Sequence, residues 1–442
     1  MRRLERIAFV DHLSAGGVSR FMLALISHMS ALYPDTRITY YVSRANISRD
    51  SLDAHFATFA NVTLVPLEPP ALNPTTQRRS GLIGRAMATL RVAPPLYYMV
   101  RWLWRRLRTS IVPPSADWWR YRLPAQVEAS LSGYDVVYFG WPFYCEPVET
   151  TAPLVATFHD FHFKRFPESY VRPQLELLER ETRQWLARCS AAVTSTRFIE
   201  ADLQSYYGDI APAVEVVYLA PYSFEHPSPE AITETLARLG VRKPYALYSG
   251  GRSGHKNFVA VLEAIGILKE QGAGVHLAIT GLGSEDIGTE ISAHPADPVH
   301  RMNLLVQQYG LERGVDYFPL GYVENADVDA LTAGADVVVS ASLYEAGCGP
   351  ANDAWQAGVP VAFSNIPPFL EQIEHFGVRA WIFDPHDPGD VAEKIRSAVF
   401  DTEATREMVE RSRSAFTTYT WDDVAREYYR VFAEAAERGP RT

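Results

Sequence analysis

The chain has 442 residues, of which 47% are hydrophobic and 21% are charged, and 42 basic against 52 acidic side chains give a formal charge of −10. This length exceeds what one hydrophobic core supports, so we expect two or three globular domains. The acidic balance argues against a protein that holds nucleic acid through its overall charge.

The three cysteines, Cys145, Cys189 and Cys348, are far apart and lack metal-ligand spacing. This usage predicts reduced thiols in an intracellular compartment. The apolar run at residues 7–10 is too short for a signal peptide, and no run approaches the 18 residues of a spanning helix. We therefore expect a cytoplasmic protein, with peripheral binding at the inner face of the cytoplasmic membrane as an open alternative.

Short apolar runs alternate with helical patterns along the chain and predict buried strands. In chain order these runs are 7–10, 136–139, 154–158, 192–194, 214–219, 246–249, 275–280, 337–340 and 359–363. Continuous apolar strands with helices between them are typical of parallel sheets covered on both faces. The pattern predicts a doubly wound α/β fold, whose ligands bind beyond the carboxyl ends of the strands.

A polar, proline-bearing segment from Pro221 to Glu234 separates the strands into two sets. We predict an N-terminal domain over 1–225, a C-terminal domain over 226–420, and a helix over 421–442 that packs back on the N-terminal domain.

An insertion rich in arginine and tryptophan interrupts the first domain at about residues 77–124. Its arginines outnumber a single acid, Asp117, and Trp102, Trp104, Trp118 and Trp119 are interleaved with them. This composition suits a helix at an anionic lipid surface. It equally suits a helical insertion that packs its tryptophans on the domain. Nucleic acid is the less favoured partner, because the rest of the chain is acidic.

Two candidate sites follow strands of the first domain. Gly16 and Gly17 stand between the first strand and a helical stretch, where glycine lets backbone N–H groups approach an anion. A tight strand-to-helix turn explains these glycines equally well. His159 and Asp160 end a buried strand, and such a pair at a strand's carboxyl end is a candidate functional pair.

The stretch GGRSGHKNF follows the first strand of the second domain. Arg252 and Lys256 lie in this glycine-rich loop, just before a helix. A forked guanidinium and a point cation at such a place suit a diphosphate. Two solvated loop cations are the alternative interpretation.

The stretch SLYEAGCGPANDAWQAG places acids on both sides of a glycine turn. Gly347 and Gly349 would expose backbone N–H groups, and Pro350 suits a first helical turn. Glu345 and Asp353 can each accept paired hydrogen bonds from the vicinal diols of a sugar. An acid in a first helical turn is also favourable against the helix dipole, which gives Asp353 a structural alternative.

In this order the motifs resemble the retaining glycosyltransferases of the GT-B fold, the group-1 family (glycosyltransferase family 4). The segments that carry the resemblance are YALYSGGRSGHKN, HLAITGLG, VDYFPLGYVENADVDALTAGADVVVSASLYEAGCG, GVPVAFSNIPPFLEQI, FDPHDPGDVAEKI and TYTWDDVAREYYRVF. The likeness is strongest from Tyr245 to Ile395 and weakest from Val65 to Gly133. It implies two Rossmann-like domains that face each other across a cleft.

The resemblance implies that Arg252 and Lys256 hold a diphosphate, that Glu345 faces the transferred sugar, and that Asp353 holds the ribose. The residues that it implies in catalysis are His159, Asp160, Arg252, Lys256 and Glu345. Its remaining donor contacts are Gly16, Gly17, Gly251, Gly281, Val323 near the base, Ala346, Gly347, Cys348 and Gly349, with the last three offering backbone amides.

Two positions depart from the family pattern. Asp353 is one methylene shorter than the family's second glutamate, and Pro350 removes a backbone donor. Recognition of the sugar and ribose is therefore expected to differ from the common pattern, while the diphosphate contacts stay.

The implied reaction moves a hexose from a nucleotide sugar, with retention and without a metal or other cofactor. The acceptor would be a glycan or a polyprenyl-diphosphate-linked glycan of a surface polysaccharide such as O-antigen, capsule or exopolysaccharide. The segment FHDFHFKRFPE favours GDP-mannose, with UDP- and dTDP-sugars as alternatives. A non-catalytic scaffold of the same fold is the second hypothesis. An NAD-dependent dehydrogenase fails, because GLGSEDIG has the wrong glycine spacing.

Overall fold

A computed structural model describes residues 2–12, 17–49, 51–68, 120–250, 253–281, 283–289, 298–416 and 418–441. The arginine- and tryptophan-rich insertion lies outside these residues, apart from its last five positions. The chain divides into two compact units: the first comprises residues 1–194, 202–217 and 424–442, and the second comprises residues 195–201 and 218–423.

The first unit contains a parallel sheet of seven strands. Their spatial order is β3 (Val62–Leu67), β2 (Arg37–Ser43), β1 (Arg6–Asp11), β4 (Val136–Phe139), β5 (Leu154–Thr157), β6 (Cys189–Thr194) and β7 (Ala213–Val216). The apolar runs predicted β1 and β4 to β7. The strands β2 and β3 escaped prediction because the first interrupts its apolar residues with polar ones and the second carries Pro66, which an edge strand tolerates.

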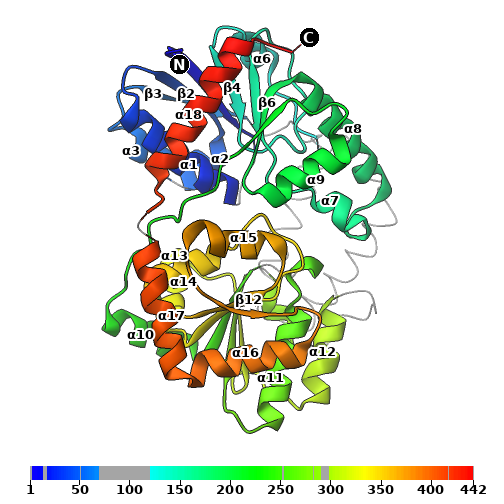
Figure 1. Ribbon diagram of the computed structural model, residues 1–442, viewed down its shortest axis with the longest axis vertical. Helices are drawn as coiled ribbons and strands as arrows, with labels where there is room; N and C mark the ends of the chain where they lie inside the picture. Colours follow the sequence, from blue (N-terminus) through cyan, green and yellow to red (C-terminus); the bar gives the residue numbers. More distant parts are fainter. Residues whose placement is uncertain are drawn as a thin grey trace, which may run out of the picture. The chain divides into compact units, whose positions relative to one another are not determined.

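Helices cover both faces of this sheet (Figure 1). In chain order they are α1 (Gly17–Leu32), α2 (Arg44–Arg49), α3 (Leu52–Phe56), α6 (Ala125–Leu131), α7 (His162–Arg165), α8 (Arg172–Arg188), α9 (Arg197–Tyr207) and α18 (Trp421–Arg438). Side chains alternate along the strands. Tyr138 packs against Phe432 of α18, with ring centroids 5.0 Å apart, whereas its neighbour Phe139 packs against Trp185 of α8 at 4.5 Å.

The helix α18 belongs to the first unit from Val424 onward, although it is the last element of the chain. Figure 1 shows it, in red, beside α1. The Tyr429 ring stacks at 3.7 Å on Tyr33, which directly follows α1, and its hydroxyl accepts a hydrogen bond from the Leu4 N–H at 3.0 Å. The C-terminal helix therefore completes the core that the N-terminal strands begin.

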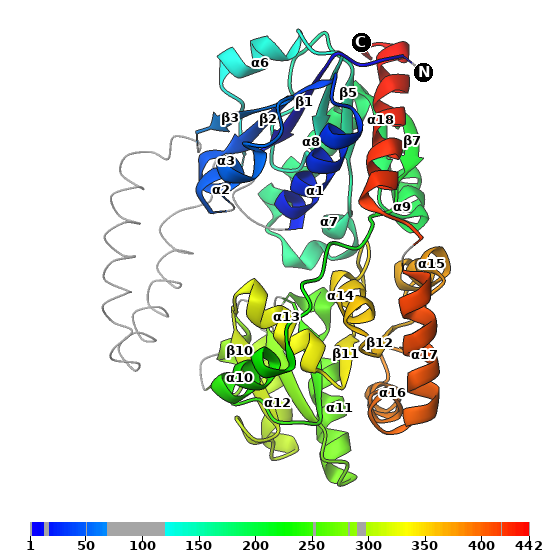
Figure 2. The same cartoon turned by 90° about the vertical axis from the view of Figure 1, so that its left-hand side faces the viewer.

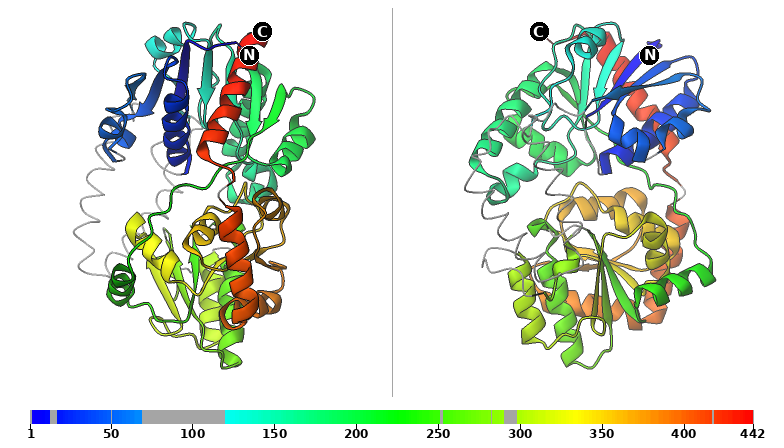
Figure 3. Two further views of the ribbon diagram at one scale, coloured as in Figure 1. Left: turned by 60° about the vertical axis from the view of Figure 1, so that its left-hand side comes forward. Right: turned by 180° about the vertical axis from the view of Figure 1, so that it is seen from behind.

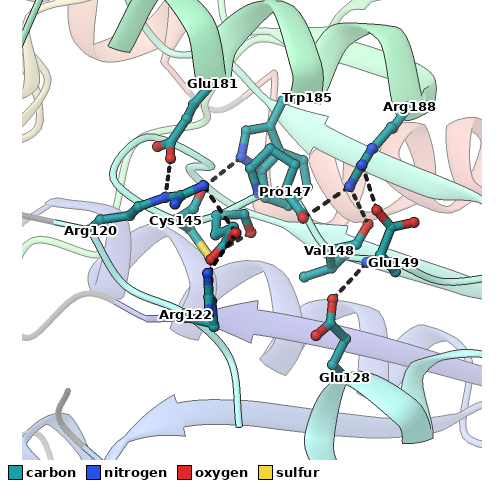
Figure 4. A network of polar contacts seen from close by, with 11 residues as sticks. Arg120, Arg122, Glu128, Cys145, Pro147, Val148, Glu149, Glu181, Trp185 and Arg188 are labelled. Carbon is teal, nitrogen blue, oxygen red and sulfur yellow. Dashed lines mark hydrogen bonds and ion pairs between the residues drawn. The ribbon is translucent and has the colours of Figure 1, made fainter. Parts of the chain in front are cut away.

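The segment that follows β4 is fastened to α8 and α6 by polar contacts (Figure 4). Trp185 donates to the Cys145 carbonyl at 2.8 Å, and Arg188 donates to the carbonyls of Pro147 and Val148 at 3.0 and 3.1 Å. The nearly buried carboxylate of Glu181 pairs with Arg120, where the described chain resumes. These bonds hold the connection between β4 and β5 in one conformation.

The second unit contains a parallel sheet of six strands, in the order β10 (Tyr317–Gly321), β9 (His276–Thr280), β8 (Tyr245–Ser249), β11 (Val337–Ser340), β12 (Val361–Ser364) and β13 (Trp381–Phe383). Its longer helices are α10 (Pro229–Leu239), α11 (Phe258–Glu270), α12 (Pro298–Gln308), α13 (Asn325–Gly334), α14 (Gly349–Ala357), α15 (Pro367–Phe376), α16 (Pro388–Phe400) and α17 (Thr402–Ala415).

Two hydrophobic clusters sandwich this sheet. Ala246 and Tyr248 belong to the cluster with α11 and α16, whereas Tyr245 and Leu247 belong to the cluster with α14 and α15. Figures 2 and 3 show the helices of this unit on both sides of its strands. The predicted α/β class with two parallel sheets is confirmed.

The strand order of each sheet reverses beside its first strand. In the first unit β1 has β2 on one side and β4 on the other, and in the second unit β8 lies between β9 and β11. Loops that leave neighbouring strands in opposite directions open a crevice at this switch point, where doubly wound sheets bind ligands. Among the described helices, none is long and apolar enough to cross a bilayer.

We expect Phe432→Ala to lower the free energy of unfolding by about 3–5 kcal/mol, because it opens a cavity between α18 and the first sheet. Phe400→Ala is the matched control, since Phe400 is 50% exposed on α16 and should change stability by about 0.5 kcal/mol or less. Urea unfolding of both variants measures the difference. Equal losses would contradict the assignment of α18 to this core.

Candidate active site

The loops after β8 and β11 meet at the switch point of the second sheet. The Leu343 N–H donates to the His255 carbonyl at 2.7 Å, which joins the two loops directly. The buried Tyr248 hydroxyl, from β8, donates to the Lys256 carbonyl. The sheet and these two hydrogen bonds therefore fix the backbones of the two loops relative to each other.

Lys256 and Glu345 come from these two loops and form an ion pair through Nζ and Oε1. The Ser342 hydroxyl donates to the same carboxylate oxygen at 2.8 Å. The two charged side chains keep 28% and 16% of their surface exposed. A ligand can thus reach a fixed cation and a fixed carboxylate at one place on the sheet edge.

The glycine turn before α14 is open to a ligand. Neither Gly347 nor Gly349 has a positive φ angle, so the backbone conformation does not require glycine there. A Cβ at Gly349 would meet nothing within 4 Å, and one at Gly347 would meet only Gln372 Oε1, at 3.8 Å. Neither backbone strain nor packing therefore requires glycine at these two positions.

The first turn of α14 contains Pro350, as the sequence predicted. Its early N–H groups have no partner within the helix and form a site for negative charge. Asp353 follows Gly349 by four residues and therefore lies on the same face of α14. Ala346 precedes the glycine turn in the same loop.

The Cys348 amide, one of the three successive amides expected to serve a ligand, has a partner within the protein. Its N–H donates to Gln372 Oε1 at 2.8 Å, while Gln372 Nε2 donates to the Cys348 carbonyl at 3.2 Å and to Asn352 Oδ1 at 2.6 Å. Gln372 lies on α15 and is 6% exposed. It holds the turn before α14 through these three hydrogen bonds.

Sequence reasoning missed Gln372 because one glutamine in an amphipathic helix resembles any polar surface residue. Its partner Cys348 lies 24 residues away, and only the packing of α15 against α14 brings the two together. The available signal was weak: the position falls on the apolar side of α15, between residues that the core buries.

The loop after β10 is also held by glycines. Gly281 and Gly321 have φ angles of 119° and 72°, in the region that favours glycine, and the Gly281 N–H donates to the Gly321 carbonyl at 2.7 Å. Val323 follows and is partly buried against the core. Gly281 and Val323 thus lie at the carboxyl edge of β9 and β10.

Three of the expected contacts, Gly16, Gly251 and Arg252, lie outside the described residues, and their roles stay predictions. Gly17 begins α1 and is exposed. It therefore stands at a helix N-terminus beyond β1, which fits both a turn that faces an anion and a tight strand-to-helix turn.

His159 follows β5 in the first unit. Its ring hydrogen-bonds the Gly140 carbonyl and meets the edge of Phe21 at 5.1 Å between centroids. Its Nε2 is buried and has no hydrogen-bond partner among the described residues. Burial lowers the pKa of His159 from 6.5 to about 4, so the ring is neutral near pH 7 and Nε2 can accept a hydrogen bond.

Asp160 has a structural contact of its own at the start of α7. Its Oδ1 accepts a hydrogen bond from the His162 N–H at 2.9 Å, at the start of the short helix α7. The two adjacent side chains therefore have different partners: Asp160 binds the His162 N–H, and the Gly140 carbonyl orients the His159 ring.

The second unit matches a known protein family, and parts of the chain are similar to known glycosyltransferases. Residues 234–415 match the family model described as "Glycosyl transferases group 1". Over 310 residues the chain is 26% identical to the O-antigen chain mannosyltransferase B of Escherichia coli, covering 69% of this chain and 76% of that protein. It is 30% identical to an uncharacterized glycosyltransferase of Methanocaldococcus jannaschii over 134 residues, which are 30% of this chain and 34% of that protein.

Solved structures share the fold along nearly the whole chain. The Anabaena protein HepE, crystallised with UDP and glucose, superposes with a TM-score of 0.63 at 15% identity, covering 97% of this chain and all of that one. WaaG, a glycosyltransferase involved in lipopolysaccharide biosynthesis, gives 0.59 at 15% identity, covering 96% and 99%. At this identity the likeness establishes the fold alone, which is GT-B, with two α/β domains.

We expect Gln372→Leu to lower the free energy of unfolding by about 1–3 kcal/mol, because it leaves the buried Cys348 N–H without an acceptor. Gln372→Glu keeps that acceptor but turns a buried carboxylate oxygen toward the Cys348 carbonyl and Asn352 Oδ1, which both accept, so its loss should be at least as large. Urea unfolding at pH 7 measures both. If the two variants match the wild type, Gln372 does not hold the turn.

The lowered pKa of His159 predicts acid sensitivity of the first unit. Between pH 6.5 and about 4 the unfolded chain binds a proton that the folded chain does not, so the free energy of unfolding falls as the pH is lowered through this window. The contribution is at most about 3.4 kcal/mol, from 1.36 kcal/mol per pKa unit.

His159→Asn should flatten this pH dependence, because its amide can still donate to the Gly140 carbonyl and does not titrate. Urea unfolding of wild type and variant at pH 7 and pH 4.5 measures the slope. Parallel slopes would show that His159 is not neutralised by burial.

Proposed function

Since the chain belongs to the group 1 glycosyltransferases through residues 234–415, we propose that it transfers a hexose from a nucleoside-diphosphate sugar to a glycan or lipid-linked acceptor. The observation that carries the proposal is the Lys256–Glu345 pair at the switch point of the second sheet. A nucleotide sugar presents an anionic diphosphate beside sugar hydroxyls, which are the two chemical groups that this pair can bind.

In the proposed complex the diphosphate accepts hydrogen bonds from the Lys256 ammonium and from the first N–H groups of α14. Glu345 accepts hydrogen bonds from sugar hydroxyls while Ser342 keeps its carboxylate in place. Asp353, on the face of α14 that carries Gly349, accepts hydrogen bonds from the ribose diol. Arg252 adds a second cation for the diphosphate.

The same groups stabilise the leaving group. As the bond from the anomeric carbon to the diphosphate oxygen breaks, negative charge grows on that oxygen and is offset by Lys256, Arg252 and the N-terminal dipole of α14. We propose that the acceptor hydroxyl attacks from the same face and gives its proton to the departing phosphate oxygen, which retains the configuration. In this scheme no divalent metal ion is required.

We propose GDP-mannose as the donor and a surface polysaccharide as the product. The segment FHDFHFKRFPE and the E. coli relative, named as an O-antigen chain mannosyltransferase, both favour this choice. The HepE complex with UDP and glucose favours a UDP-sugar as the alternative. Lipid-linked acceptors would draw a cytoplasmic enzyme to the inner face of the membrane.

Thermal unfolding with GDP, UDP, ADP and dTDP, each with magnesium and with EDTA, tests the donor site. A nucleotide at about 100 times its dissociation constant should add roughly 2.7 kcal/mol of stability. We expect this shift with GDP, unchanged by EDTA. A shift with UDP or dTDP instead would replace mannose as the donor sugar, and a shift that needs magnesium would contradict the metal-free scheme.

Lys256→Ala should abolish the shift, whereas Lys269→Ala should keep it, because Lys269 pairs with Asp316 at the far end of α11. Turnover of the donor then distinguishes the glycosyltransferase hypothesis from the hypothesis of a non-catalytic scaffold of the same fold. Binding without any turnover in the presence of glycan acceptors would favour the scaffold.

A further inference from the structure

The switch point of the first sheet contains a histidine to which the proposed donor site gives no role. His12 follows the last residue of β1, and its Nε2 lies 3.0 Å from the Phe143 carbonyl oxygen, in the segment after β4. The bond therefore crosses the point at which the strand order reverses. A carbonyl can only accept, so Nε2 carries the proton and Nδ1 is left as an acceptor.

Nothing in the described part of the chain uses that acceptor. His12 is 8% exposed, and its Nδ1 is buried without a hydrogen-bond partner. Burial lowers the pKa of His12 to about 4, so the ring is neutral near pH 7. Because buried polar atoms are nearly always paired, an unpaired acceptor at a ligand-binding edge points to a donor that arrives with the ligand.

The surroundings of His12 suit a carbohydrate. A neutral nitrogen acceptor requires an O–H or N–H donor and offers nothing to a phosphate. Tyr121 stacks against the imidazole at 5.7 Å and 21°, and the partly exposed Trp141 lies edge-on to Phe143 at 5.3 Å. Sugars present hydroxyl donors together with apolar C–H faces, which aromatic side chains of this kind can cover.

The segment that presents these groups is rigid and strained. It supplies both carbonyls that orient the two histidines, from Gly140 to His159 and from Phe143 to His12. The next residue, Tyr144, has a φ angle of 61°, which a non-glycine residue seldom adopts. Such strain persists where the surrounding structure imposes it, and it is concentrated at functional sites.

His12 and His159 lie apart along the edge of the first sheet. They follow β1 and β5, and β4 lies between those two strands. Neighbouring strands are about 4.8 Å apart, which separates the two strand ends by roughly 9–10 Å. If His159 contacts the donor sugar, as the family resemblance implies, a group on β1 meets a second sugar.

We propose that His12 binds the acceptor, with Nδ1 receiving a hydrogen bond from a hydroxyl of the acceptor sugar. This inference rests on the proposed glycosyltransferase function. It makes the switch point of the first sheet the acceptor subsite, bounded by His12, Tyr121 and Trp141.

Two substitutions separate this binding role from a structural one. In His12→Gln the amide nitrogen takes the place of Nε2 and keeps the bond to the Phe143 carbonyl, but the acceptor at Nδ1 is lost. In His12→Asn the amide oxygen takes the place of Nδ1, while the bond to Phe143 is lost. His226→Gln, at an exposed position, is the control for the chemical change.

The probes are GDP-mannose as donor and an α-linked mannotriose as acceptor, with tetrasaccharide formation as the readout. We expect H12Q to raise the KM for mannotriose at least about 10-fold, with the KM for GDP-mannose within about twofold of the wild type and an unchanged thermal midpoint. H12N should show the opposite pattern, with a lowered thermal midpoint and a smaller change in the KM for mannotriose.

An unchanged KM for mannotriose in H12Q, or equal changes in the KM values for donor and acceptor, would overturn the assignment of His12 alone. Failure of the wild type to transfer from any nucleotide sugar whose nucleotide stabilises it would instead overturn the proposed function, and the His12 inference with it.

Discussion

The rest of the structure depends on one constraint, the reversal of strand order beside the first strand of each parallel sheet. Because parallel strands must be joined by crossovers, the loops on either side of this point leave in opposite directions and cannot cover the edge between them. Polar side chains of the described residues gather at this edge. In the second unit this edge carries Lys256 and Glu345, and in the first it carries His12.

Side chains from packed helices hydrogen-bond the buried backbone groups near both edges. Buried backbone groups that face protein are satisfied by protein: Gln372 holds the turn at Cys348, and Trp185 and Arg188 hold the segment after β4. Forming these bonds costs little conformational entropy, because the side chains that donate them lie on helices that already pack against the sheets. A preorganised loop can then present its remaining groups to a ligand without reorganising.

The two edges differ in the charge that they offer. Lys256 and Glu345 form a mutually neutralising pair, partly exposed, which a ligand with both an anionic group and hydroxyls can separate without leaving either charge unpaired. His12 and His159 are instead neutral acceptors, kept so by burial. Our proposals thus assign an anionic donor and an uncharged acceptor sugar to two edges with different chemistry.

The sequence by itself determined the α/β class and most strands, because a fully buried parallel strand reads as a continuous apolar run and such runs are local. It also indicated Lys256 and Glu345, since polar residues that directly follow buried strands must lie at the sheet edge. The apolar runs missed four strands: polar residues or proline interrupt β2, β3 and β10, and β13 has only three residues. Only the tertiary structure decided that the Cys348 amide is taken by Gln372 and that His12 keeps one unused nitrogen. Those outcomes depend on partners 24 and 131 residues away, which strand order and helix packing bring together and which no local pattern encodes.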